Sequence, residues 1–426
     1  METDLAGADA GRRRGLPGPV VWFMSLAAGL GTATIYALQP AIADVADSLH
    51  ASLAAVGVAL ACGPLGYMVG LGLLVPLVDR FPPRRVLSAQ VGALAAALLL
   101  CALVGDVLVL GATISVIGAC SAVGAGLSSV VGRLASPHRR AATLGLLTAG
   151  ISAGILAGRI VGGWLAEVIG WRGMLMAFAA ACAAVAVGLL LVVPGTRGGA
   201  ERGYLATLKS IPGLLVRNTA LRSAATRGAL WFFAFCAIWA GLAVALSEPP
   251  YSYSAERIGL YAFAGLLGIP ATRVAGMFTD RVGARRVILL GLAVAGAATV
   301  IVGFALSSAP ATLLCLALFD AGLFAAQVAN QSTVLAIDPA APARFNSAYM
   351  LVYFVGGSLG TAFGATAVER FGWPATTAFA AAAIVVAAAI TLGARGRSVP
   401  STTPEPAEDL FIKSHAMEPP NGFHNR

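Results

Sequence analysis

The chain has 426 residues, of which 58% are hydrophobic and only 11% are charged, and its formal net charge at pH 7 is +9. A soluble domain carries about 25% charged residues, so this composition excludes a soluble globular protein and predicts that most of the surface faces lipid. The Arg residues lie mainly in short stretches between apolar runs, which is typical of membrane-protein loops and argues against nucleic acid as a partner.

The apolar runs are long enough for twelve membrane-spanning helices of about 20 residues each. In the first half we predict spans at 19–42, 52–78, 86–105, 108–133, 142–166 and 173–193. In the second half we predict spans at 224–246, 257–278, 287–306, 310–336, 346–368 and 374–394.

These spans predict five segments along the chain. Residues 1–18 form an N-terminal tail, 19–193 a first six-helix bundle, 194–223 a linker loop, 224–394 a second six-helix bundle, and 395–426 a disordered tail. Most Lys and Arg residues fall on the same side as the N-terminus, which predicts that both termini and the linker are cytoplasmic.

Two landmarks recur at nearly the same offset. The string Asp79-Arg80-x-x-x-Arg84-Arg85 returns 201 residues later as Asp280-Arg281-x-x-x-Arg285-Arg286. The dipeptide Gly170-Trp171 returns 202 residues later as Gly372-Trp373. Such an internal repeat predicts two pseudo-symmetric halves around one central site.

The charged strings resemble the loop between the second and third helices of the major facilitator superfamily. The second copy, which starts at Gly276, follows the family pattern closely, whereas the first has Val75 and Pro82 in place of its glycines. The resemblance implies an all-α integral membrane protein with twelve transmembrane helices in two six-helix bundles, and a cytoplasmic gate at the charged strings. A plain positive-inside loop is the alternative for these residues.

The fifth span is similar to the antiporter signature of the drug:proton branch of that superfamily. The signature glycines are present, but Arg159 stands where the signature has proline. The fourth-span Arg of that branch is also missing, and Gly118 occupies its place. We expect a smooth helix-packing face formed by Gly145, Gly154, Gly158, Gly162 and Gly163.

Three of the charges that fall inside predicted spans are candidates for a function. Asp320 lies about ten residues, or ~15 Å, inside the tenth span, where a carboxylate is costly unless it is paired or protonated. It is therefore our candidate for proton coupling, with a structural role as the alternative. Arg159 lies at a similar depth, so we test the hypothesis that it pairs with Asp320; for Arg273 an internal ion pair is the leading interpretation.

Polar and aromatic residues mark four spans that line the cavity in the superfamily. Together they favour an amphipathic organic substrate, although each alone is as compatible with packing. The candidates are Tyr36, Gln39, Trp231, Trp239, Gln327, Asn330 and Gln331.

The sequence therefore predicts a secondary transporter that works by alternating access. Proton-coupled efflux of a small amphipathic compound or drug, by a monomer in the bacterial plasma membrane, is the leading hypothesis. A metabolite importer or uniporter, and a non-transporting sensor or scaffold, are the alternatives. No enzyme activity, metal site or cofactor is expected, and the proton gradient would supply the energy.

Overall fold

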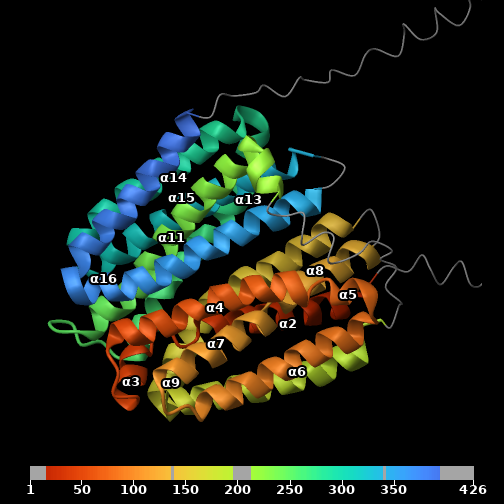
Figure 1. Cartoon of the computed structure of the whole chain (residues 1–426), viewed down its shortest axis with the longest axis horizontal. Helices are drawn as coiled ribbons and strands as arrows, with labels where there is room; N and C mark the ends of the chain where they lie inside the picture. The colour runs from red at the N-terminus through yellow and green to blue at the C-terminus, as the bar shows by residue number, and fades with distance from the viewer. Residues whose placement is uncertain (1–15, 136–138, 195–212, 339–341, 394–426) are drawn as a thin grey trace, which may run out of the picture. The chain divides into compact units, whose positions relative to one another are not determined.

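The described part of the protein is entirely helical in its secondary structure (Figure 1). A computed structural model describes residues 16–135, 139–194, 213–338 and 342–393. The helices of the first half are α2 (Gly18–Tyr36), α3 (Ile42–Ser48), α4 (Leu53–Leu73), α5 (Leu77–Arg80), α6 (Pro83–Ala102), α7 (Val107–Ser121), α8 (Val123–Leu134) and α9 (Arg140–Val192). Those of the second half are α11 (Thr219–Ser247), α12 (Ala255–Leu260), the 3-10 helix η1 (Tyr261–Leu267), α13 (Gly268–Val282), α14 (Ala284–Ala305), α15 (Ala309–Leu335) and α16 (Pro342–Gly393).

Ten segments in the described ranges are long and apolar enough to cross a membrane. Two of them, in α9 and α16, are double, because each contains one residue with non-helical dihedrals: Gly170 at φ 74° and Gly372 at φ 77°. Only glycine adopts such angles without steric cost. Each double helix therefore supplies two spans, which confirms the twelve predicted helices and explains why Gly-Trp recurs at the fifth-to-sixth and eleventh-to-twelfth junctions.

Some predicted boundaries are wrong. The first span was expected to reach residue 42, but α2 ends at Tyr36 and α3 begins at Ile42. Pro40 has no amide hydrogen to continue the helical ladder, so the chain turns there. The seventh span begins at Thr219 rather than at 224, because the Asn218 side chain caps it by accepting from the Leu221 amide at 2.9 Å.

The same helix pairing occurs in both halves. In the first half α9 packs on α2, with Gly154 against the carbonyl of Gly29. In the second half α16 packs on α11, with Gly360 against the carbonyl of Phe233. At both positions a Cβ atom would collide with backbone, so the glycines allow the close approach that small residues give membrane helices.

The two halves meet at one end of the helices. We call the end that carries the α5–α6 and α13–α14 junctions the charged-loop end, and the end that carries α3 the opposite end; α3 and α5 lie at the two ends of the first bundle (Figure 1). The hydrogen bonds found between the halves, in the described ranges, involve the first part of α4: the Glu369 carboxylate accepts from the Ala54 amide at 2.7 Å, and Ser358 donates to the Ala61 carbonyl. At the same end Gly163 of α9 approaches Ala255 of α12.

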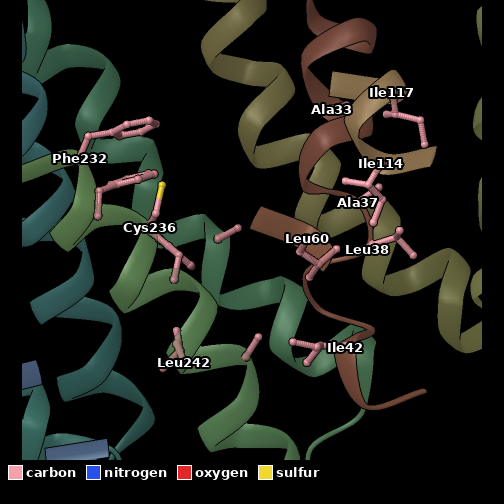
Figure 2. Packing of buried hydrophobic residues seen from close by; sticks show 14 of the residues in the cluster. Ala33, Ala37, Leu38, Ile42, Leu60, Ile114, Ile117, Phe232, Cys236 and Leu242 are labelled. Carbon is pink, nitrogen blue, oxygen red and sulfur yellow. The ribbon is translucent and has the colours of Figure 1, made fainter. Parts of the chain in front are cut away.

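Buried apolar side chains of both halves belong to one packed cluster. Figure 2 shows Ala33 of α2 and Ala37, directly after its end, near Leu60 and Ile114 on one side, and Cys236 of α11 on the other. The site described next lies among these helices.

Candidate functional site

Arg159 sits on the face of α9 that turns toward the second half. Its neighbour Gly158 packs on Ala33 of α2, so the next residue points away from that interface. The side chain is only 3% exposed, and its Nε atom donates to Oε1 of Gln39 at 2.8 Å. A glutamine oxygen is a neutral acceptor, so this bond leaves the positive charge uncompensated.

Aromatic rings from both halves surround the Arg159 guanidinium. Its central carbon lies 4.2 Å from the ring centroid of Trp239, 4.9 Å from that of Tyr36 and 5.7 Å from that of Phe235. Ring faces attract a cation most strongly when water is excluded. Arg159 therefore links α2 and α9 of the first half to α11 of the second.

Asp320 contacts the same Trp239 side chain as Arg159 does. It is 1% exposed in the middle of α15, and its Oδ1 atom accepts from the indole Nε1 of Trp239 at 3.1 Å. No hydrogen bond or ion pair joins Arg159 directly to Asp320, although both side chains are described, so the hypothesised direct pair is not present. Trp239 instead touches both charges, and we name the series Gln39, Arg159, Trp239 and Asp320 the buried polar chain.

A cavity adjoins the buried polar chain. Its volume is about 150 Å³, and a smaller cavity of about 20 Å³, which Arg159 and Asp320 help to line, lies next to it. The larger one, which we name the aromatic cavity, has eight aromatic residues among the fifteen that line it, and none that is charged. Tyr36 and Phe235 line this cavity and also contact Arg159.

The predicted cavity residues fall into separate places. Tyr36, Trp231 and Gln327 line the aromatic cavity, whereas Gln39 and Trp239 belong to the buried polar chain. Asn330 bonds to Arg227, and Gln331 donates to Asn346 of α16 at 3.0 Å. Sequence reasoning missed several aromatic residues of the cavity, because single spans do not reveal which helical face points inward: Tyr67, Phe232, Phe235, Phe324, Tyr353 and Phe354.

Arg227 is a functional candidate that the sequence analysis did not single out, although it falls within the predicted span 224–246. It lies inside α11, is 7% exposed, and donates from Nε to Oδ1 of Asn330 at 2.6 Å and from Nη2 to Oγ1 of Thr333 at 3.3 Å. The available signal was its position four residues before Trp231, on the same helical face.

Four of the five glycines predicted to form a packing face contact the backbone of a neighbouring helix, and one does not. Gly154, Gly158 and Gly162 press on the backbone of α2, and Gly163 on that of α12. A Cβ at Gly145 would meet nothing within 4 Å, so this glycine takes no part in the close packing.

Most residues of the charged strings lie at the surface. The described side chains of Arg80, Arg84, Arg85, Asp280, Arg281, Arg285 and Arg286 are exposed, and that of Asp79 lies outside the described side chains. Arg285 donates to the carbonyl of Leu392 at 2.7 Å. Gly283 has φ 88° where the first copy has Pro82, so the two turns use different residues to leave the helix.

Arg273 differs from the expectation of an internal ion pair. Its side chain is exposed on α13, and no ion-pair partner for it is found among the described residues. A lock between the halves through Arg273 is therefore not present in this conformation.

Twelve spans in two similarly packed halves, with charged groups and a cavity between them, define an integral membrane protein of the transporter class. A sequence model of the Major Facilitator Superfamily matches residues 21–272 and 250–418, and the chain belongs to this family.

Relatives and one solved structure agree with this assignment. The "Uncharacterized transporter YgaY" of Escherichia coli is 30% identical over 354 residues, which cover 83% of this chain and 90% of that protein. A "Multidrug resistance protein B homolog" of Mycobacterium tuberculosis is 27% identical over 176 residues, 39% of this chain and 32% of the relative. The solved structure of the nucleoside transporter NupG has the same fold, with a TM-score of 0.70, 14% identity, and coverage of 88% of this chain and 99% of that one.

Proposed function

We propose that this protein exports a small amphipathic organic compound in exchange for protons. It would do so as a monomer in the bacterial plasma membrane, with both termini in the cytoplasm. The observation that carries the proposal is the buried polar chain, which places one carboxylate, Asp320, beside a charge of the other half and next to the aromatic cavity. The low-identity multidrug resistance relative supports efflux over uptake.

The buried polar chain offers a physical route from protonation to movement. An ionised Asp320 holds the Trp239 indole by a charge-assisted hydrogen bond, and the Trp239 ring in turn contacts Arg159. A proton on Asp320 removes that charge and weakens the bond. The ring that connects the two halves is then held less tightly, so proton binding shifts the equilibrium between transporter conformations.

The aromatic cavity supports an amphipathic substrate. Its ring faces provide a large apolar surface, while the hydroxyl groups of Tyr36, Tyr67 and Tyr353 and the amide of Gln327 provide a few polar contacts. This combination is typical of sites for small organic molecules.

The test is transport by purified protein in proteoliposomes. The compound that most raises the unfolding temperature of the protein in a screen serves as substrate, and internal pH is recorded at the same time. We expect Asp320→Asn to abolish accumulation driven by a pH gradient, while exchange at equal pH persists. Asp47→Asn, at an exposed position of α3, is the matched control and should behave as the wild type.

The direction of proton flow distinguishes export from import. Protons that leave the side toward which the substrate moves support exchange, whereas protons that accompany the substrate would indicate an importer. Unchanged gradient-driven accumulation in the Asp320→Asn variant would remove this carboxylate from the mechanism.

A further inference from the structure

Arg227 is a buried charge that the proposed proton exchange does not use. The acceptors found for its guanidinium in the described ranges are the neutral side chains of Asn330 and Thr333. A guanidinium has five N–H groups, and its Nη1 atom has no hydrogen-bond partner among the described residues. A buried charge without a counter-charge is costly, and this cost indicates that a group of opposite sign joins Arg227 in part of the cycle.

Arg227 lies one helical turn beyond the lining of the aromatic cavity, toward the charged-loop end, and is not itself one of the lining residues. On α11 it lies one helical turn before Trp231, which lines the cavity, so both side chains are on one face. On α15 its partner Asn330 lies three residues after Gln327, which also lines the cavity. Gln327 in turn accepts from the Tyr349 hydroxyl at 2.6 Å.

The charges around the cavity are unsuited to a cationic substrate. No acidic residue lines it, and the ring faces of Tyr36 and Phe235, which could hold a cation, already contact Arg159. At one end of the cavity the charge of Arg159 is offset by that of Asp320, which lines the same adjoining cavity, whereas Arg227 near the other end has neutral partners. The field favours a ligand that carries a negative group.

We propose that Arg227 binds the anionic group of the transported compound while its ring occupies the aromatic cavity. The substrate class is therefore an amphipathic aromatic carboxylate. A guanidinium pairs well with the two oxygens of a carboxylate, and Asn330 holds it in place by the bond to Nε. This inference rests on the proposed function for the identity of the site, but it concerns binding and not coupling.

The anion site is separate from the proton site. Asn330 and Asp320 are ten residues apart on α15, or about 15 Å along the helix. A substitution at one of these sites therefore does not directly disturb the other, and its effect can be measured separately.

The experiment measures binding of three probes that share one ring system. These are 2-naphthoate, the neutral 2-naphthamide and the cationic 2-naphthylmethylammonium, each titrated at pH 7 against the unfolding temperature of the purified full-length protein. The concentration dependence of the shift gives each dissociation constant. We expect the carboxylate to bind about tenfold or more tightly than the amide, in line with a charge-assisted hydrogen bond, and the ammonium compound to bind most weakly.

The variant Arg227→Gln should bind the carboxylate no more tightly than the amide, while its affinity for the amide stays within about twofold of the wild type. Arg222→Gln is the matched control, because Arg222 is an exposed arginine of the same helix and should leave the carboxylate preference intact. If Arg227→Gln does not fold, the order of the three dissociation constants on the wild-type protein still tests the predicted preference for a carboxylate. Equal binding of carboxylate and amide, a preference for the ammonium compound, binding of none of the three, or an undiminished carboxylate preference in Arg227→Gln would each overturn the inference.

The two proposals can fail independently. Loss of the carboxylate preference in Arg227→Gln together with unchanged proton coupling in Asp320→Asn would leave the anion site standing and remove the proton role. The opposite pair of results would remove the anion site alone.

Discussion

The two halves of this transporter repeat their packing but differ in their buried chemistry. Gly154 and Gly356 occupy equivalent places, 202 residues apart, each pressed against a carbonyl of the first helix of its half. Position 118 and position 320 are also equivalent, at an offset of 202, yet one is glycine and the other aspartate. Gly118 packs against the carbonyl of Gly63, so a side chain has no room there, whereas Asp320 reaches the Trp239 indole.

This comparison shows how a repeated scaffold acquires a single site. The glycine faces hold the first and fifth helices of each half together, and their spacing must be kept in both copies. The charged groups are under no such constraint. Arg227 and Asp320 lie in the second half, and Arg159 of the first half contacts Trp239, the hydrogen-bond donor to Asp320, so the asymmetry places these charges at the interface.

The largest effect is expected from Gly118→Asp, which would give the first half the carboxylate of the second. The new side chain would collide with the Gly63 carbonyl, and a charge at this depth costs a further ~2.5–3.5 kcal/mol. We expect loss of folded protein, measured as the monodisperse fraction after purification. Gly118→Ala measures the effect of the collision without the charge. A well-folded Gly118→Asp protein would show that positions 118 and 320 are more alike than the packing indicates.

The next effect compares the glycine faces of the two halves. Gly154→Ala and Gly356→Ala each place a methyl group against backbone, so each should lower the free energy of unfolding by about 1–3 kcal/mol. Gly145→Ala is the control, because open space surrounds it and alanine favours a helix by about 0.5–1 kcal/mol over glycine. Thermal unfolding in detergent gives the ranking, and a Gly145→Ala loss as large as that of Gly154→Ala would contradict it.

A smaller effect is expected from Trp239→Phe, which removes the donor to Asp320 while keeping an aromatic ring. The carboxylate then lacks the hydrogen bond from Nε1, at a cost of about 1–3 kcal/mol when it is ionised. A double-mutant cycle with Arg159→Ala and Asp320→Asn, measured on transport and stability, should show coupling in the wild type and little in the Trp239→Phe protein. Trp22→Phe is the control, since Trp22 is 66% exposed. Equal coupling in both backgrounds would mean that the indole does not connect the two charges.

The smallest effect on stability is expected from Asp280→Ala in the repeated charged loop. The side chain is exposed, so the free energy of unfolding should change by less than about 0.5 kcal/mol. If the loop is a gate, Asp280→Ala and Asp79→Ala should each increase labelling of engineered cysteines from the charged-loop side. Unaltered labelling in both variants would favour a plain topology signal.

The sequence alone determined the class of the protein, the number of spans and the internal repeat. These follow from the length of apolar runs, from the position of Arg residues and from the recurrence of motifs, all of which are properties along the chain. It also marked Gly170 and Gly372, because a helix break between two spans needs a residue that tolerates positive φ. Depth was predictable as well, since helix rise fixes how far Asp320 lies from the end of its span.

The tertiary structure decided which side chains meet. Helix rise gives depth but not rotation, so the sequence could not show that Trp239 contacts both Arg159 and Asp320, or that Arg227 turns inward. The sequence also could not show that eight aromatic residues from separate helices line one cavity. Contacts between helices depend on how each one is turned against its neighbours, and here the glycine faces of α9 and α16, pressed on α2 and α11, set that rotation.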